Sequence, residues 1–262
     1  MFDTIDYRLD AGIATIRLNR PDRHNAINHQ MHLELPQVWQ RFNEDPAAIV
    51  AIVTGAGERA FCSGADVADL PRPEMDSADG LRWTAIQNKV WKPVICAVNG
   101  LTVGGGLHFV ADADIVIAAE HASFSDSHVS VGLVAGLEPV SLARRMPLEA
   151  VLRMALMGRE ARLDAARAMA LGMVGDVVPA GELLARAEAV ARIIARNSPG
   201  AMARTKRAIW QSLELPLHAA LDRAWAEIQA NNAGPDFQEG IAAFRERRAP
   251  NWPPLTLDLL HE

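Results

Sequence analysis

Cysteine and aromatic residues are scarce in this sequence. The two cysteines, Cys62 and Cys96, stand far apart and form no Cys-x-x-Cys pair, which excludes the usual metal and redox spacings. Reduced thiols and a cytoplasmic location are therefore expected. Aromatic residues make up 5% of the chain and the net charge is −6. Both values argue against base-stacking platforms and against binding to a phosphate backbone, so no nucleic-acid partner is expected.

Long apolar runs are also missing. The most apolar window, residues 94–111, is interrupted by Asn99, Thr102 and His108 and contains four glycines, so it is unlike a membrane span. The first ten residues carry three aspartates and no apolar stretch, which is unlike a signal peptide. We expect no membrane partner.

Several catalytic and nucleotide-binding motifs are absent. The glycines at 100, 104, 105 and 106 do not fit G-x-G-x-x-G, and no G-K-[ST] follows a glycine loop, which disfavours a dinucleotide fold and a P-loop. Ser63 does not lie in G-x-S-x-G, and there is no H-E-x-x-H, so neither a nucleophile elbow nor a zinc site is indicated. No metal is expected.

Alternating strand and helix patterns in the first part of the chain predict an α/β core. Strands are expected as a hairpin over 7–18 and at 49–54, 93–98 and 114–118, and early helices at 30–43, at 77–90 and from about Gly105. Later helices are expected at 183–194, 199–212, 216–230 and 236–247. These patterns divide the chain into a core over residues 1–197 and a helical region over residues 198–262.

Two segments of small residues, 60–67 and 98–107, each follow an expected strand. Glycine lets a backbone approach a ligand closely, and the first N–H groups of a helix have no partner inside it. If the two turns converge, two N–H groups can point at one carbonyl oxygen and form an oxyanion hole. Tight packing of strand on helix is the alternative explanation of the glycines.

The same segments carry a family resemblance. Residues 16–27 (IRLNRPDRHNAI), 52–55 with 61–66, and 97–100 with 104–106 resemble the enoyl-CoA hydratase/isomerase (crotonase) family, and the resemblance runs from about residue 5 to 252. It implies a spiral of ββα units with a C-terminal α-helical oligomerisation region. It also implies homotrimers or hexamers built as dimers of trimers, an acyl-CoA substrate and a role in fatty acid metabolism. Coenzyme A would be part of the substrate, with no separate cofactor.

The resemblance also assigns roles by position. Ala65 and Gly105 would donate their N–H groups to the thioester oxygen. Arg23 would meet a coenzyme A phosphate, unless it is a solvated cation of the turn. The remaining positions that would contact the substrate are Ala26, Asp66, Val67 and Ala68.

The sequence departs from the family at both acid/base positions. Hydratases of this family carry glutamates where this chain has His108 and His128. Imidazole titrates near neutral pH, so a histidine pair can still transfer protons. His108 would lie in the first helical turn, where the helix dipole favours the neutral ring. Asp126 could hold one tautomer of His128 or favour its charged form, and Glu138 is either a third catalytic group or an acid at a helix start.

The function that these observations favour is an enoyl-CoA hydratase-like lyase in which a His/His pair replaces Glu/Glu. A hydrolase or isomerase of the same family, acting on a β-keto or cyclic acyl-CoA, is an alternative. A catalytically silent acyl-CoA-binding subunit is an alternative of another class. The enzyme hypotheses share the thioester enolate and differ in what the side chains above the acyl group do. For the silent subunit, the histidines at both glutamate positions are in favour, and the presence of Ala65 and Gly105 is against it.

Overall fold

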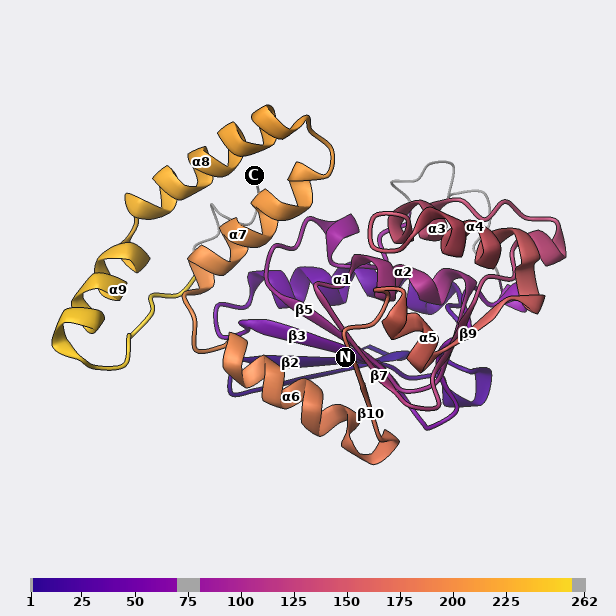
Figure 1. The fold of residues 1–262 in the computed structure, drawn as a ribbon. Coiled ribbons are helices and arrows are strands. Elements are labelled where there is room, and N and C mark those ends of the chain that lie inside the picture. Colours follow the sequence, from indigo (N-terminus) through magenta and orange to yellow (C-terminus); the bar gives the residue numbers. More distant parts are fainter. Residues whose placement is uncertain (1, 70–80, 256–262) are drawn as a thin grey trace.

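The computed structural model describes residues 2–69 and 81–255. Its strands form two sheets (Figure 1). The large sheet has the order β1-β2-β3-β5-β7-β10, and the small sheet has the order β4-β6-β8-β9. The strands of the large sheet are β1 (Ile5–Asp10), β2 (Ile13–Leu18), β3 (Val50–Gly55), β5 (Val94–Val98), β7 (Ile115–Ala119) and β10 (Asp176–Val178). Those of the small sheet are β4 (Ala60–Cys62), β6 (Leu101–Val103), β8 (Ser123–Ser125) and β9 (Arg162–Asp164).

The chain winds as a spiral. Three successive pairs of strands, β3/β4, β5/β6 and β7/β8, each place their first strand in the large sheet and their second in the small sheet. Neighbours from successive turns pair in parallel, as strands joined by crossovers do. The antiparallel exceptions are β1/β2 and β8/β9. This arrangement is the expected spiral of strand-strand-helix units.

Helices fill the spaces around the sheets. Those within the spiral are α1 (His29–Glu44), α2 (Leu107–Asp112), α3 (Leu137–Leu142), α4 (Leu148–Met157) and α5 (Ala165–Ala170). They are followed by α6 (Leu183–Ile194), α7 (Pro199–Ser212), α8 (Leu217–Asn232) and α9 (Pro235–Glu246). Among the described residues no helix is long and apolar enough to cross a membrane.

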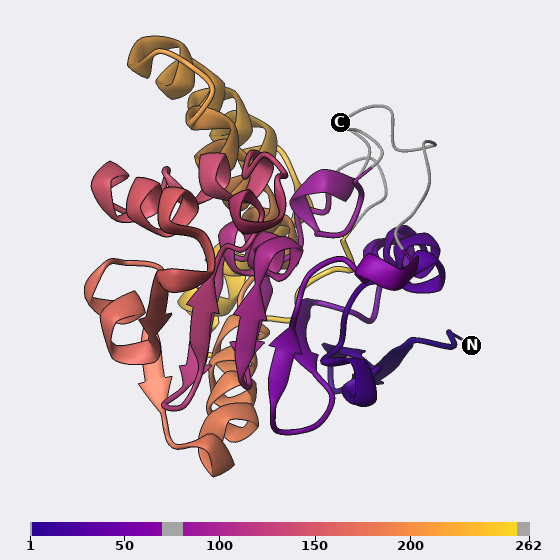
Figure 2. The same ribbon diagram turned by 90° about the vertical axis from the view of Figure 1, so that its right-hand side faces the viewer.

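Strand β3 shows how the large sheet is buried on both faces. Val50 and Ile52 pack in a cluster with α6, whereas Ala51 and Val53 belong to the main core on the other face. Side chains alternate along a strand, so a continuous apolar run supplies both cores. Figure 2 shows the strands standing nearly upright, with the C-terminal helices extending above them.

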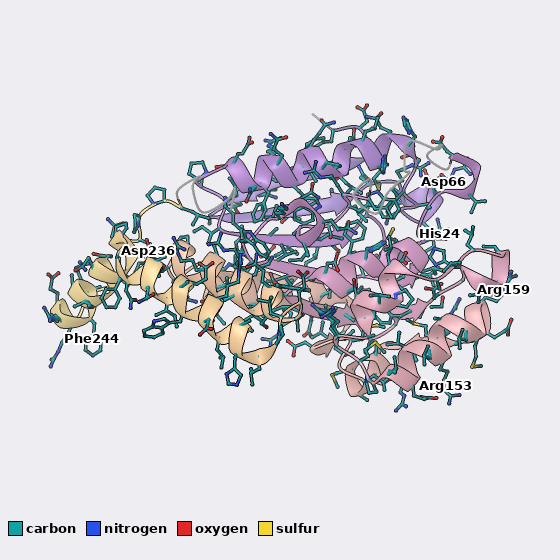
Figure 3. The ribbon with its side chains drawn as sticks, turned by 90° about the horizontal axis from the view of Figure 1, so that it is seen from above. His24, Asp66, Arg153, Arg159, Asp236 and Phe244 are labelled. Carbon is teal, nitrogen blue, oxygen red and sulfur yellow. The ribbon has the colours of Figure 1, made fainter. Side chains whose placement is uncertain are left out.

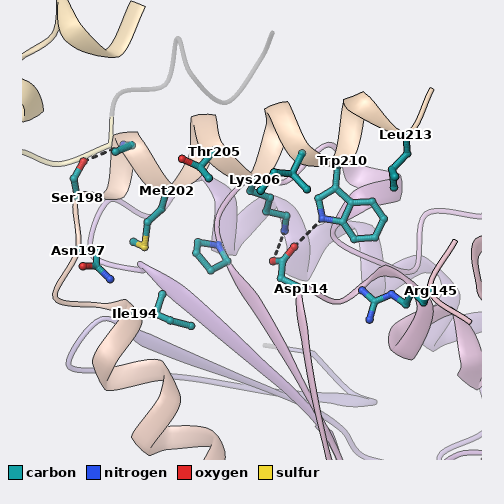
Figure 4. Close-up of a pocket in the computed structure, with 13 residues that line it drawn as sticks. Asp114, Arg145, Ile194, Asn197, Ser198, Met202, Thr205, Lys206, Trp210 and Leu213 are labelled. Atoms are coloured by element: carbon teal, nitrogen blue, oxygen red, sulfur yellow. Dashed lines mark hydrogen bonds and ion pairs between the residues drawn. The ribbon is translucent and has the colours of Figure 1, made fainter. Parts of the chain in front are cut away.

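Helix α7 is tied to the sheet through Asp114, which directly precedes β7. The Asp114 carboxylate lies 2.9 Å from Lys206 Nζ and accepts a hydrogen bond of 2.8 Å from Trp210 Nε1 (Figure 4). A groove of about 540 Å³ runs beside these contacts, between α6, α7 and the sheet. None of the candidate site residues lines it.

The structure agrees with most expected elements and corrects one. The hairpin forms, and its turn at Ala11 and Gly12 has positive φ at both residues, as a type I′ turn requires. The expected helix at 77–90 is wrong over its described part. Residues 77–80 lie outside the described residues, and only a 3₁₀ turn, Ile86–Asn88, forms in the rest.

Local hydrogen bonds explain this correction. The Gln87 Oε1 atom accepts from the backbone N–H groups of Trp83 and Thr84, and Asn88 Nδ2 donates to the Thr84 carbonyl. Such side-chain bonds give the backbone an alternative to the helical pattern. The segment ends at Lys89, whose φ of +55° stops a helix.

Candidate active site

The two glycine turns converge at one edge of the small sheet. Strands β4 and β6 pair in parallel, so their carboxyl ends meet there. The contact is close enough to require glycine. A Cβ on Gly64, whose φ is +88°, would lie 3.0 Å from Gly105 N, and one on Gly106 would lie 2.3 Å from the Cys62 carbonyl oxygen. A Cβ on Gly105 would lie 3.5 Å from Ala65 N.

The pairing of Ala65 with Ile27 orients the Ala65 amide. Ile27 N–H donates to the Gly64 carbonyl, and Asp66 N–H donates to the Ile27 carbonyl. In such a parallel bridge the residue between the two bonded positions points its own N–H away from the partner strand. The Ala65 N–H therefore faces away from Ile27.

His108 is the second residue of α2 and is 2% exposed. Its Nε2 lies 3.3 Å from Glu138 Oε1. Its Nδ1 is buried and has no hydrogen-bond partner among the described residues. Because buried polar atoms are normally paired, this nitrogen is an atom that a substrate or a water molecule can engage.

Asp112 lies one turn after His108 on α2 and accepts a hydrogen bond of 2.6 Å from the Thr84 hydroxyl. Burial raises the pKa of Asp112, while the Thr84 hydrogen bond and the nearby His108 oppose this rise. Asp112 thus adds a buried acidic group close to His108, and the structure gives it a positioning contact with Thr84.

His128 is held by Asp126. The Asp126 Oδ1 atom lies 2.8 Å from His128 Nδ1 and also accepts the His128 backbone N–H at 2.9 Å. Asp126 itself is 0% exposed, whereas the His128 side chain is 24% exposed. The hydrogen bond to Asp126 is the main cause that raises the pKa of His128. Burial opposes this rise, and the Glu138 carboxylate adds to it. The contact fixes the ring and favours imidazolium.

Glu138 joins the two histidines. This buried residue of α3 places Oε1 3.3 Å from His108 Nε2 and 3.9 Å from His128 Nε2. The resulting series of side chains runs from His108 through Glu138 and His128 to Asp126. A Cβ on Gly104 would lie 3.3 Å from His128 Cε1, so the His128 ring packs against the glycine turn.

Asp126, His128 and Glu138 offer ligand-type atoms that all lie within 4.8 Å of one another. His128 presents Nδ1 to Asp126 and Nε2 to Glu138, so each carboxylate faces a different ring nitrogen. Because Asp126 already bonds Nδ1 and Glu138 lies near Nε2, this arrangement of one ring between two carboxylates suits proton transfer. The absence of a metal stays a prediction.

The expected coenzyme A residues lie beside the first glycine turn. Arg23 is exposed in the 3₁₀ turn Pro21–Arg23, and Val67 and Ala68 are exposed in the turn after Ala65. Asp66 forms an ion pair of 2.9 Å with Arg20. Seen from above, His24 and Asp66 lie at the end of the molecule opposite Asp236 and Phe244 (Figure 3).

Arg20 is a residue that the sequence analysis did not single out. Besides the pair with Asp66, its guanidinium donates 2.6 Å to the Ala26 carbonyl. Arg20 therefore ties both expected coenzyme A segments together. Its place in the resembling stretch, three residues before Arg23, was the signal that could have found it.

Comparison with known proteins shows which family has this fold. A family model described as enoyl-CoA hydratase/isomerase matches residues 8–254. The chain belongs to the enoyl-CoA hydratase/isomerase family. It is 36% identical to an (E)-benzylidenesuccinyl-CoA hydratase of Thauera aromatica, over 91% of this chain and 94% of that protein. It is also 36% identical to a mevalonyl-coenzyme A hydratase of Aspergillus fumigatus, over 94% and 93%.

Solved structures of the family superpose well. An enoyl-CoA hydratase/isomerase from Mycobacterium paratuberculosis matches with a TM-score of 0.86 and 43% identity, covering 96% of this chain and 99% of that one. An enoyl-CoA hydratase from Bacillus anthracis matches with a TM-score of 0.88 and 30% identity, covering 95% and 99%. The expected family and the crotonase fold are therefore confirmed.

Proposed function

We propose that this protein is an acyl-CoA hydratase, a lyase that adds water across the double bond of an enoyl-CoA thioester. Family membership and the hydratase names of its relatives support this reaction class. The observation that carries the proposal is the placement of His108 and His128 on one carboxylate, Glu138, beside the converging glycine turns.

In this proposal the N–H groups of Ala65 and Gly105 bind the thioester oxygen. Water addition moves negative charge onto that oxygen as the enolate forms, and two fixed donors stabilise it. Each donor of this kind contributes roughly 10²–10³ in rate. The close backbone contact of Gly64 with Gly105 supports donors that do not move during the reaction.

The histidines divide the proton transfers. His108, as the neutral ring, takes a proton from water while the water oxygen bonds to Cβ of the acyl group. His128, as imidazolium, gives a proton to Cα. Asp126 favours that charged form of His128, because its hydrogen bond raises the pKa of the ring. The product is the 3-hydroxyacyl-CoA, with one water added and no redox change.

One turnover leaves His108 charged and His128 neutral. Glu138 can restore the starting state, since its Oε1 faces Nε2 of both rings at 3.3 and 3.9 Å. It accepts the proton from His108 and passes it to His128. This proposal gives Glu138 a catalytic role that two glutamates in the family positions would not require.

For coenzyme A we propose contacts with Arg23, Ala26 and the stretch 65–68. Arg23 is exposed beside the turn, where it can reach a phosphate without a desolvation cost. No separate cofactor is required for water addition.

We propose a cytoplasmic location for the protein.

We also propose a homotrimer, alone or paired into a hexamer. The C-terminal helices leave large apolar side chains exposed, among them Leu217, Trp225 and Phe244, the last 86% exposed. Helix α4 does the same with Leu148 and Leu156. Large apolar side chains left exposed on several helices support an interface between copies of this chain. Light scattering on the purified protein measures the assembly, and a monomer at micromolar concentration contradicts it.

The experiment that tests the reaction is a screen of enoyl-CoA thioesters read by mass spectrometry. A hydratase produces the mass of one added water, whereas a thioester hydrolase releases free coenzyme A. His108→Gln and His128→Gln are each expected to lower kcat about 10²–10⁴-fold, and His121→Gln, an exposed position, is the control. Tight acyl-CoA binding without turnover of any thioester would instead indicate a silent binding subunit.

A further inference from the structure

Trp83 lies beside both halves of the candidate site. Its Cζ3 atom is 2.9 Å from the position that a Cβ on Gly105 would occupy. Its ring centroid is 5.7 Å from that of His108, at an interplanar angle of 85°. The same indole therefore contacts the glycine proposed to bind the thioester oxygen and packs edge-on against the histidine proposed to activate water.

The indole is held from several directions. Trp83 Nε1 donates 2.9 Å to His32 Nδ1 on α1, and the Trp83 carbonyl accepts 2.7 Å from Trp39 Nε1. Its backbone N–H donates 2.8 Å to Gln87 Oε1. The next residue, Thr84, is hydrogen-bonded to Asp112 on α2. The backbone bonds fix the residue that carries the ring, and the ring itself, which is only 4% exposed, cannot swing aside without breaking its bond to His32.

A fixed ring at this place limits the space next to the thioester. The acyl group has to leave the carbonyl carbon within a few bonds of Gly105, and the Trp83 ring already fills the space on that side of the glycine. A buried aromatic wall rejects additional methylene groups because close-packed surroundings do not yield.

We propose that Trp83 is the specificity-determining residue of this site and that it selects acyl-CoA thioesters with short acyl groups. The inference rests on the proposed acyl-CoA function and deepens it by naming the substrate class. Trp83 limits the space for the acyl group and does not act as a proton donor, because its indole N–H already donates to His32.

The test is a series of straight-chain 2-enoyl-CoA thioesters of four to ten carbons, measured as kcat/KM. The wild type is expected to prefer the shortest member. Trp83→Leu removes the ring and is expected to raise the ratio of the eight-carbon to the four-carbon value by at least about tenfold, since one methylene group in a pocket is worth roughly 10–200-fold. Trp83→Phe keeps a smaller ring, and its ratio is expected to lie between those of the wild type and Trp83→Leu.

Trp39→Phe is the matched control. It removes the hydrogen bond to the Trp83 carbonyl and disturbs the same part of the core, but leaves the Trp83 ring in place. Its chain-length ratio is expected to stay within about twofold of the wild type. Equal proportional losses on all chain lengths in Trp83→Leu would overturn the inference and assign the ring to positioning His108. A wild type that is indifferent to chain length would also overturn it.

Binding measurements distinguish a failure of this inference from a failure of the proposed reaction. Calorimetry with saturated acyl-CoA thioesters of the same lengths needs no turnover. A shift of the affinity ratio toward longer chains in Trp83→Leu supports the wall even if no enoyl-CoA is hydrated, in which case only the hydratase proposal fails. Hydration by the wild type together with an unchanged affinity ratio in Trp83→Leu overturns the wall alone.

Discussion

Replacing Asp126 by asparagine tests the proposed division of roles between the two histidines. Asp126→Asn keeps the size of the side chain and removes the charge that faces His128 Nδ1 at 2.8 Å. Asp126 is fully buried, and its Oδ2 atom has no hydrogen-bond partner among the described residues. The substitution therefore acts mainly through the hydrogen bond to His128.

The expected effect depends on pH, and its sign follows from the raised pKa of His128. The charged ring persists above the ordinary histidine pKa of about 6.5, so activity that needs His128 as an acid is present at low pH and lost as pH rises through the raised value. A hydrogen bond to a charged group is worth about 1.5–3 kcal/mol. Without it, the alkaline limb of the kcat profile is expected to move to lower pH, with a loss of roughly 10–100-fold on that limb.

The stability of the protein is expected to depend on pH in the same direction as the activity. Because folding raises the pKa of His128, the stabilisation from this pair is fully present below the ordinary value and is lost as pH rises through the raised one. Asp126→Asn is thus expected to lower the free energy of unfolding more at pH 6 than at pH 9, measured by urea denaturation.

The assay is kcat against pH for the wild type, Asp126→Asn, His128→Gln and the double variant. In the double variant the Asp126 substitution is expected to add little, since its partner ring is already gone. An alkaline limb that stays in place in Asp126→Asn, in a protein with native circular dichroism, would refute the assignment of His128 as the acid.

Three further predictions concern the surroundings of the site. Glu138→Gln is expected to lower kcat about 10²–10⁴-fold with little change in KM, because proton return between the rings is lost; steady-state kinetics within threefold of the wild type would contradict the relay. Gly105→Ala is expected to lower the free energy of unfolding by about 1–3 kcal/mol, since its Cβ meets Trp83 at 2.9 Å; combining it with Trp83→Phe should recover part of this loss in a urea titration. Burial raises the pKa of Cys62 to about 12 and also raises that of Cys96, so both thiols should react with a disulfide reagent at pH 8 only after denaturation. Rapid labelling of the native protein would show that one of them is accessible.

The sequence predicts the long elements of the fold, because the pattern of each lies within one continuous segment. The helix expected at 199–212 has these bounds in the structure, where Ser198 caps it and Pro199 is its first residue. The small sheet could not be predicted residue by residue. Its strands, such as Ala60–Cys62, have three residues each, and their pairing is decided by contacts with strands of other turns.

The sequence likewise predicts some features of the candidate site and not others. His108, His128, Asp126 and Glu138 were named from position and type, and the structure brings all four into one series. Distances between them could not come from spacing, since Glu138 reaches both rings from a separate helix. The contact of Trp83 with Gly105 could not be predicted, because it joins segments far apart in the chain and the segment around Trp83 has no regular periodicity.

In the proposed mechanism, the four side chains offer a reason why histidines can stand where glutamates are expected. A pair of glutamates brings its own negative charge and needs one proton to serve as acid and base. Two neutral imidazoles bring no negative charge, and two imidazolium rings would repel each other. Glu138, between the rings and nearly excluded from water, supplies the charge that stabilises one proton on the pair, and Asp126 biases that proton toward His128. The proposed acid, base and carboxylate then form one unit, so changing any of its members is expected to alter the protonation of the others.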